Sequence, residues 1–166
     1  PTMMKKIDIE EAERYKHIEE KDPYLPLLSQ NISIIEVGAY SQIFDKFIDF
    51  LGIKSLVITD LDATNEDGEK CRVSDGISYS NSAISHYFGG KTINELKNYI
   101  LTDKIFNKVD NTWTAQENGK LCITYQTTEN GYNARSFEDA FIHINRNFVN
   151  RNKDGFKGLK NKALFD

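Results

Sequence analysis

The hydrophobic positions of this chain fall into short blocks rather than one long run. Two blocks, Ile32–Val37 and Ser55–Thr59, are continuous and rich in β-branched residues, which is typical of buried strands. Between them, Gln42–Leu51 places apolar residues at helical spacing, with Ser41 as the expected N-cap and Gly52 just past the end. Strand, helix and strand within about thirty residues predict a parallel βαβ unit with a right-handed crossover.

Further elements are predicted on both sides of this unit. They are a helix over Asp8–Lys21, a helix from Thr92 to about Leu101, a strand over Leu121–Tyr125 and a helix from Ser136 to about Asn150. In contrast, residues 63–90 are rich in turn-forming residues, and we expect a long loop there. The pattern therefore predicts an α/β fold with a compact parallel sheet flanked by helices.

Composition limits the class of protein. With 166 residues, of which 39% are hydrophobic and 28% charged, the chain is large enough for one core. No apolar run approaches the roughly 18 to 20 residues that cross a bilayer, and no signal-peptide pattern opens the chain. With only two cysteines, a cytoplasmic, reduced protein is expected. The net charge of −4 argues against nucleic-acid binding by overall charge alone, so metal ions or a local basic patch would have to compensate.

The strongest chemical signal is the pair of acids in Asp60-Leu61-Asp62. The pair follows a predicted parallel strand directly, and open α/β sheets place their sites beyond the carboxyl ends of such strands. In extended chain, Asp60 and Asp62 leave the backbone on the same side, so both carboxylates can face one Mg²⁺ or Mn²⁺ ion. The alternative is a turn in which both acids only hydrogen-bond the loop that follows.

A second acidic position lies at the start of the last predicted helix. The spacing of Ser136 and Asp139 suits a capping interaction, which leaves Glu138 free to point elsewhere. The helix dipole alone would also favour negative charge in this first turn, without any catalytic purpose.

The end of the chain is locally basic. Six cations lie between residues 146 and 162, against a single acid, Asp154; they are Arg146, Arg151, Lys153, Lys157, Lys160 and Lys162. Such a run would be either a contact for DNA phosphates or a solvated tail without a binding role.

Three stretches of the chain resemble a known family. They are IIEVGAYSQIFDKFIDFLGIKSLVITDLDAT, KCRVSDGISYSNSAISHYF and ITYQTTENGYNARSFEDAFIHIN. Together they resemble the Toprim nuclease domain of OLD-family (overcoming lysogenisation defect) ATP-dependent endonucleases, over roughly Ile32 to Asn150. The resemblance implies a Toprim fold and Mg²⁺-dependent (or Mn²⁺-dependent) cleavage of DNA phosphodiester bonds. In that family's pattern Asp60 and Asp62 match the DxD metal-binding acids, and Glu138 matches an acidic position near the metal site.

Two parts of the family's pattern have no match. A first strand with glutamate in a V-E-G context is absent, and a lysine in a K-x-x-F-A-like context cannot be assigned to Lys157, Lys160 or Lys162. We therefore expect a single, partial Toprim domain that is inactive by itself, with a helical lead-in over residues 1–30, a core over 31–150 and a basic tail over 151–166. The resemblance implies DNA and an ATP-binding ATPase domain of the same protein as partners, and it allows a homodimer.

Two other functions use the same acids. Asp60-Leu61-Asp62-Ala63-Thr64 also spells the DxDxT of haloacid-dehalogenase-like phosphatases, in which Asp60 would be the nucleophile and Asp62 the general acid/base. A non-enzymatic, receiver-like module would instead accept phosphate on a strand-end aspartate. The predicted strand and helix ahead of Asp60 and the lack of a later G-D-x-x-x-D motif speak against the phosphatase.

Overall fold

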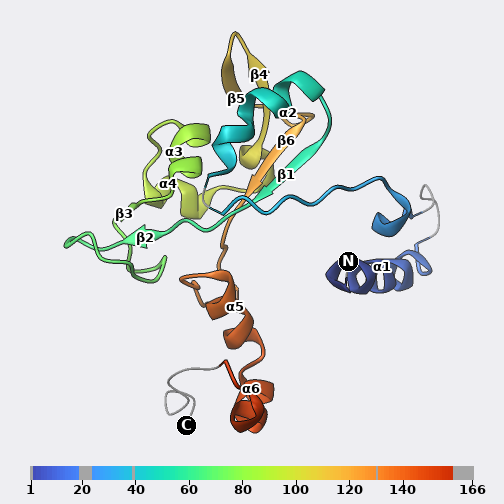
Figure 1. Ribbon diagram of the computed structural model, residues 1–166, viewed down its shortest axis with the longest axis vertical. Coiled ribbons are helices and arrows are strands. Elements are labelled where there is room, and N and C mark those ends of the chain that lie inside the picture. Colours follow the sequence, from blue (N-terminus) through green and yellow to red (C-terminus); the bar gives the residue numbers. More distant parts are fainter. Residues whose placement is uncertain (1, 19–23, 39, 130, 159–166) are drawn as a thin grey trace. The chain divides into compact units, whose positions relative to one another are not determined.

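The structure is a computed structural model that describes residues 2–18, 24–38, 40–129 and 131–158 (Figure 1). The chain divides into two compact units, Pro1–Glu36 and Val37–Asp166. The acid pair Asp60 and Asp62 belongs to the second unit.

The first unit is a helix joined to a short helical turn. The helix α1 spans Thr2–Tyr15 and the 3-10 turn η1 spans Leu27–Ser29. The carboxylate of Asp8 links them by accepting hydrogen bonds from the Tyr24 hydroxyl and from the amides of Leu27 at 2.7 Å and Leu28 at 3.0 Å. The helix thus begins before the predicted Asp8 and ends before the predicted Lys21, which lies outside the described residues.

Ile32–Val37 does not form a strand, so the prediction of a βαβ unit was wrong. The segment pairs with no strand in the described part of the chain, and Ile34 and Ile35 are 65% and 60% exposed. A strand is stable only when a neighbour satisfies its backbone groups, and an apolar β-branched sequence cannot supply that neighbour by itself.

The second unit is built on a four-stranded mixed sheet. Its strands are β1 (Ser55–Ile58), β4 (Ile105–Val109), β5 (Thr112–Ala115) and β6 (Leu121–Thr124), in the spatial order β1-β6-β4-β5. Strands β1 and β6 are parallel, while β4 is antiparallel to both β6 and β5. The expected α/β class is confirmed, but the sheet is not purely parallel.

The antiparallel part has a local cause. Strands β4 and β5 are joined by Asp110 and Asn111, which both have positive φ, 48° and 62°. A two-residue turn of this kind matches the twist of a hairpin and can only join antiparallel strands.

The segment predicted as a loop over residues 63–90 contains regular structure, so that prediction was wrong. It holds a small hairpin of β2 (Ala63–Thr64) and β3 (Ser78–Tyr79), followed by helix α3 (Ser82–Phe88). The strands are only two residues long, which is too short for a period-2 pattern to be visible in the sequence.

Three of the four predicted helix-end signals are confirmed, among them Ser136, whose hydroxyl accepts from the Asp139 amide at the start of α5 (Phe137–Ile144). Thr92 caps α4 (Ile93–Asn98) in a capping box with Glu95, and Gly52 takes φ 61° at the end of α2 (Asp45–Leu51). Ser41, however, lies inside a 3-10 turn, η2 (Ser41–Phe44), and caps nothing.

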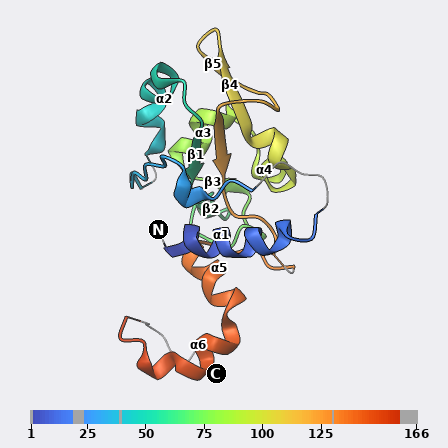
Figure 2. The ribbon, with the colours of Figure 1, turned by 90° about the vertical axis from the view of Figure 1, so that its right-hand side faces the viewer.

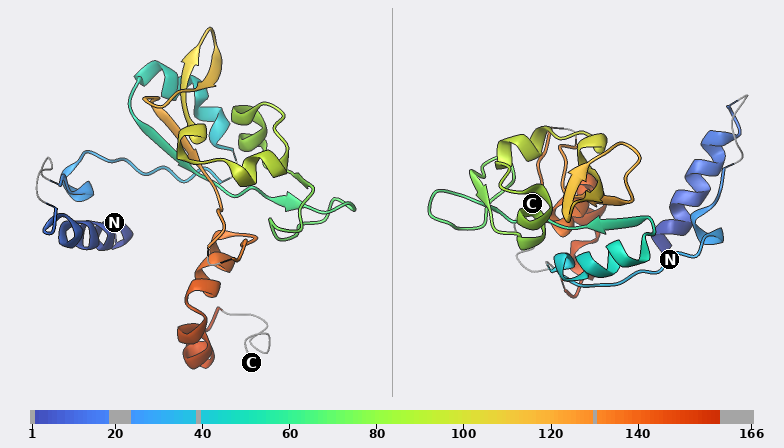
Figure 3. Two further views of the ribbon diagram at one scale, coloured as in Figure 1. Left: turned by 180° about the vertical axis from the view of Figure 1, so that it is seen from behind. Right: turned by 90° about the horizontal axis from the view of Figure 1, so that it is seen from above.

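The core lies between one face of the sheet and the helices α3 and α4, which pack together beside it (Figure 3). Buried side chains come from the sheet, from both helices and from the segment that follows β1; among them are Leu61, Ile84, Leu96, Leu121 and Ile123. On the other face of β1, Leu56 and Ile58 are 61% and 74% exposed. This alternation follows from the period of two in strands.

The last predicted helix is broken in two, contrary to expectation (Figure 2). Helix α5 spans Phe137–Ile144, and α6 spans Arg146–Asn152, before a 3-10 turn η4 at Lys153–Gly155. The break is at Asn145, whose side-chain amide donates to the carbonyl of Phe141 at 2.8 Å. Asparagine competes in this way for helical backbone groups, which explains the interruption.

Gly119 tests how closely the turn before β6 packs against β4. A Cβ there would lie 2.4 Å from the carbonyl oxygen of Phe106 on β4, and backbone atoms cannot move aside easily. We expect Gly119→Ala to lower the free energy of unfolding by about 2–3 kcal/mol, as overpacking does. Gly155→Ala is the control, since nothing lies within 4 Å of its Cβ position. Equal urea midpoints for the two variants would contradict the close approach of Gly119 to the backbone of Phe106.

Candidate functional site

The candidate site lies where the parallel strands β1 and β6 end side by side. The ladder continues one residue past β1, because the Thr59 amide donates to the Thr124 carbonyl at 3.0 Å. Beyond this point β1 is followed by Asp60, and β6 is followed by Tyr125 and Gln126. Parallel pairing therefore brings the acid pair and Gln126 to the same edge of the sheet, although 66 positions separate Asp60 from Gln126.

Gln126 fixes the first acid in place. Its Nε2 donates to Oδ1 of Asp60 at 3.0 Å and to the carbonyl of Arg135 at 2.9 Å. Its Oε1 accepts from the amide of Leu61 at 2.8 Å. A single side-chain amide thus holds the acid-bearing backbone, one carboxylate and the segment that leads into α5.

Asn81 supports the same backbone from the other direction. It is 2% exposed, and its Nδ2 donates to the Thr59 hydroxyl at 2.9 Å and to the Asp60 carbonyl at 2.7 Å. Its Oδ1 accepts from the amides of Ala83 and Ile84 and so caps α3. One buried amide therefore anchors both the start of α3 and the end of β1.

Asp60 and Asp62 flank a completely buried Leu61. Asp62 has a positive φ of 52°, and its carbonyl accepts from the Ser80 amide at 3.0 Å, so the turn into β2 is held firmly. Left-handed backbone is uncommon for residues other than glycine and is tolerated best by Asn and Asp. The chain is therefore not extended through Asp62, contrary to the expectation, and Asp62 acts on Asp60 through its charge.

The charges at this edge raise the pKa of Asp60. Burial is the largest cause, and the negative charges of Asp62 and Glu138 add to it, in that order. The positive charge of Lys70 and a backbone hydrogen bond from Phe137 act in the opposite direction. The negative charges of Asp62 and Glu138 therefore disfavour ionisation of Asp60.

The two neighbouring acids of α5 have different surroundings. Asp139 accepts hydrogen bonds from the Tyr132 hydroxyl at 3.0 Å and the Arg135 amide at 2.8 Å, while its own amide donates to the Ser136 hydroxyl. Glu138 is exposed, and hydrogen bonds from its own amide and from Ser136 lower its pKa. Asp139 is thus committed to local structure, whereas the charge of Glu138 acts on Asp60.

A lysine neutralises part of the acidic edge. The Nζ of Lys70 lies 2.8 Å from Oδ1 of Asp62. Asp62 is 23% exposed and Lys70 is 66% exposed, so the pair is accessible to solvent on the lysine side.

No ready-made metal centre exists at this edge. Within the described ranges, no three His, Cys, Asp or Glu side chains are grouped closely enough to hold a metal ion. Any cation bound by Asp60 and Asp62 would therefore keep most of its ligands as water or substrate oxygen, which is the usual way for Mg²⁺.

The predicted basic residues lie beyond the acid-bearing end of α5. Arg146 and Arg151 are exposed on α6, Lys153 is half-buried in η4 and Lys157 is exposed after it. Lys160 and Lys162 lie outside the described residues. The structure places Asp62 and Glu138 where their charges act on Asp60, and it places the basic group on a separate helix.

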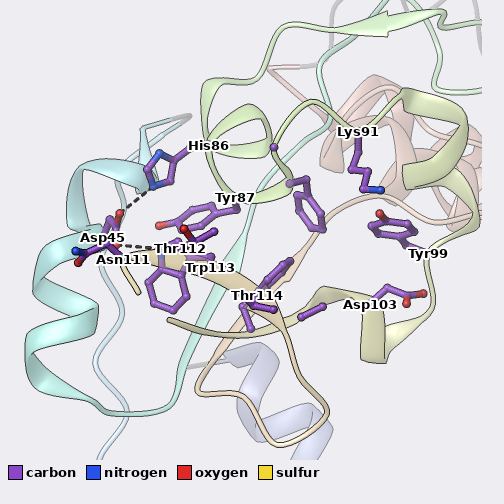
Figure 4. A pocket seen from close by; sticks show the side chains of 14 residues that line it. Asp45, His86, Tyr87, Lys91, Tyr99, Asp103, Asn111, Thr112, Trp113 and Thr114 are labelled. Carbon is purple, nitrogen blue, oxygen red and sulfur yellow. Dashed lines mark hydrogen bonds and ion pairs between the residues drawn. The ribbon is translucent and has the colours of Figure 1, made fainter. Parts of the chain in front are cut away.

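A pocket of about 410 Å³ elsewhere in the second unit is a competing candidate. Aromatic side chains form much of its wall; they include Tyr87, Phe88, Tyr99, Phe106 and Trp113. Figure 4 shows Asp45 at one side between His86 and Trp113. The Asp45 carboxylate accepts from Lys108 at 2.8 Å and Trp113 at 3.0 Å and contacts His86 at 2.9 Å.

The Asp45 carboxylate in this pocket is already satisfied by protein partners. Burial by itself raises the pKa of Asp45, but the hydrogen bonds from Lys108, His86 and Trp113 outweigh it and lower that pKa. A carboxylate with three donors holds α2, α3 and the β4–β5 hairpin together, and has little capacity left for a ligand. We therefore favour the strand-end edge as the functional site, although it does not line this pocket.

Sequence reasoning missed Gln126 and Asn81. Gln126 could have been found, because the strand-end rule that selected Asp60 applies equally to the next strand of the sheet. Asn81 carried only an N-cap signal in Ser80-Asn81-Ser82, and its contact with the Asp60 backbone depends on tertiary structure.

Comparison with protein-family models, with curated proteins and with solved structures finds no match to this chain. In the part of the chain that the structure describes, no helix is both long and apolar enough to cross a bilayer. The functional argument therefore depends on the geometry of the strand-end edge.

Two half-buried aspartates with opposite pKa shifts make a matched pair of tests. Because the folded pKa of Asp60 is raised, its contribution to stability falls as pH rises from 3.8 through the folded pKa. Asp60→Asn removes a repelling charge, so at pH 7 without metal we expect a higher melting temperature. A lower melting temperature would contradict the claim that the ionised Asp60 carboxylate destabilises the folded unit.

The pKa of Asp45 is lowered, so its contribution is present above 3.8 and is lost as pH falls through the folded pKa. Asp45→Asn should lower the free energy of unfolding at pH 7 by about 1–2 kcal/mol, as loss of partly buried charged hydrogen bonds does. Urea titrations of both variants at pH 7 and pH 3 measure this difference, and we expect the Asp45→Asn deficit to shrink at pH 3.

Proposed function

We propose that this chain is the metal-dependent nuclease domain of a DNA endonuclease and that it hydrolyses phosphodiester bonds at the edge formed by Asp60 and Asp62. The resemblance to the Toprim domain of OLD-family ATP-dependent endonucleases suggests this reaction. The geometry of the strand ends supports it independently.

The observation that carries the proposal is the way Gln126 and Asn81 hold Asp60 and its backbone beside Asp62 at one strand end. Burial raises the pKa of Asp60 in the folded unit, and the negative charges of Asp62 and Glu138 add to this effect. Gathering like charges costs stability, and a cation bound between them would recover that cost. Such clusters are common at catalytic sites.

The residues present fit a magnesium ion by their chemistry. Mg²⁺ prefers carboxylate oxygens, usually binds one or two of them, and completes its shell with water and substrate phosphate. Asp60 and Asp62 supply two carboxylates, and Glu138 on the first turn of α5 is exposed beside them.

Each residue of the edge has a definable part in the proposed reaction. Asp60 and Asp62 hold the cation, Gln126 orients the Asp60 carboxylate, and Asn81 fixes the backbone between them. Glu138 adds negative charge from α5. When bound, Mg²⁺ lowers the pKa of a water molecule and stabilises the charge on the leaving oxygen. Placement and charge are most of what phosphoryl transfer requires of a protein.

The substrate and partners of the proposal follow from the resemblance. DNA supplies the phosphodiester, and an ATPase domain of the same protein would couple ATP binding to cleavage. Because the chain has a net charge of −4, DNA can approach only where positive charge is concentrated.

Metal binding should stabilise the fold. We expect 10 mM Mg²⁺, acting on a site with a dissociation constant on the order of 1 mM, to add about 1.4 kcal/mol to the free energy of unfolding. For a chain of this size that corresponds to a rise in melting temperature of roughly 3–5 °C. Asp60→Asn and Asp62→Asn should abolish the response, whereas Asp67→Asn, a loop acid that remains exposed, should keep it.

Cleavage tests the reaction itself. In the full-length protein with Mg²⁺ or Mn²⁺, Asp60→Ala and Asp62→Ala should each reduce plasmid cutting by at least about 100-fold, because each removes stabilisation of developing charge. The domain should remain folded, because both carboxylates lie outside its core.

Asp67→Ala is the matched control, and a small phosphomonoester is the second substrate. Undiminished cutting by both site variants would rule out the proposed nuclease site. Hydrolysis of the phosphomonoester without DNA cutting would favour the phosphatase instead.

A further inference from the structure

Three cationic side chains lie around the acidic edge, and none of them belongs to the basic end of the chain. They are Lys70, Arg72 and Arg135. Lys70 pairs with Asp62 at 2.8 Å. Arg135 is tied to Asp60 through Gln126, whose Nε2 donates both to the Arg135 carbonyl at 2.9 Å and to Asp60 at 3.0 Å. The guanidinium of Arg72 lies 5.4 Å from the ring centre of Tyr132.

The backbones that carry these cations are held by hydrogen bonds. Residues 70–72 run beside β2, since Thr64 forms a bridge with Lys70 and the Cys71 amide donates to the Ala63 carbonyl at 3.0 Å. The Arg135 amide donates to Asp139 at 2.8 Å. The backbone positions of the three cations are therefore fixed, although their side chains extend into solvent.

The cations share electrostatic neighbours. The hydrogen bond with Asp62 raises the pKa of Lys70, and the positive charge of Arg135 opposes this rise slightly. Burial raises the pKa of Tyr132, and the positive charges of Arg72 and Arg135 both oppose that rise. Neither guanidinium forms a salt bridge with a carboxylate within the described ranges. Unpaired guanidinium groups beside a site for phosphodiester cleavage are suited to binding phosphate oxygens.

Lys70 differs from the two arginines, because its ammonium lies where a metal ligand is needed. A divalent cation bound to Asp62 would compete with Nζ of Lys70 for Oδ1 and would repel the ammonium. Lys70 is 66% exposed on a flexible stem, so it can leave Asp62 without disturbing the core.

We propose, on the basis of the nuclease function above, that Lys70 is a displaceable cation that couples metal binding to DNA binding. It neutralises Asp62 in the metal-free protein, leaves when Mg²⁺ binds, and then joins Arg72 and Arg135 in contacting the DNA phosphate backbone. Metal binding and DNA binding thus strengthen each other, as linkage requires.

Lys70→Gln should change the two affinities in opposite directions. Without its competitor, the site should bind Mn²⁺ roughly two- to fivefold more tightly, which is the range of an exposed ion pair. DNA binding in Ca²⁺ should weaken several-fold, and its salt slope should fall by about 0.9, the value for one phosphate contact. Lys91→Gln, which removes a lysine paired with Glu95 at 3.1 Å, is the control and should change neither.

The measurements use the full chain. The EPR signal of free Mn²⁺ gives the metal affinity, and fluorescence anisotropy of a labelled duplex at several salt concentrations gives the DNA affinity, with a gel to check that the duplex stays intact. A change of both affinities in the same direction, or of neither, would overturn the role of Lys70. A purely structural lysine would weaken both.

The arginines have their own test. The double variant Arg72→Gln/Arg135→Gln should leave Mn²⁺ affinity nearly unchanged and lower the DNA salt slope by about 1.8, that is 0.9 for each contact. The control is Arg146→Gln/Arg151→Gln on α6. A loss of slope only in the α6 variant would place the DNA on the basic end of the chain and overturn the inference.

These outcomes separate the inference from the function on which it rests. If Asp60→Asn and Asp62→Asn leave Mn²⁺ binding unchanged, the proposed metal site fails, and the coupling through Lys70 fails with it. If those variants abolish Mn²⁺ binding but Lys70→Gln changes nothing, only the coupling fails.

Discussion

The parallel pairing of β1 with β6 is the constraint on which the site depends. Because both strands end at the same edge, Asp60 and Gln126 meet although they are distant in sequence, and Gln126 then connects Asp60 to the segment that opens α5. Loss of this pairing would separate the acid pair from Glu138. The β4–β5 hairpin, which is held to α2 and α3 through Asp45, supports the pairing from the far side of β6.

Two side-chain amides hold the acidic edge. Amide groups of Asn81 and Gln126 donate to and accept from the backbone around Asp60 without adding charge, so the carboxylates keep their negative charge for another partner. Lys70 supplies part of the compensating charge from an exposed position. Hydrogen bonds hold the backbone around the acids, whereas the carboxylates can still exchange their charged partners. A cation site with exchangeable ligands requires both.

The parts of the fold that depend on local sequence could be predicted, and the parts that depend on distant partners could not. Ser55–Thr59 was predicted as a strand and Thr92 as a cap because their signals are local. Ile32–Val37 has an equally strong strand pattern, yet it forms no strand because no partner pairs with it. The roles of Gln126 and Asn81 arise from tertiary contacts across the sheet edge, so only the aspartates of this site were visible in the sequence.

Mn²⁺ titration of the full chain, followed by paramagnetic broadening of its backbone amide NMR signals, tests most directly whether Asp60 and Asp62 hold a cation. The amides of residues 59–62, 81, 126 and 138 should broaden first and together, and Asp60→Asn should prevent this. Broadening that begins around Asp45 and the aromatic pocket, or that is the same in Asp60→Asn, would contradict a metal site at the strand ends.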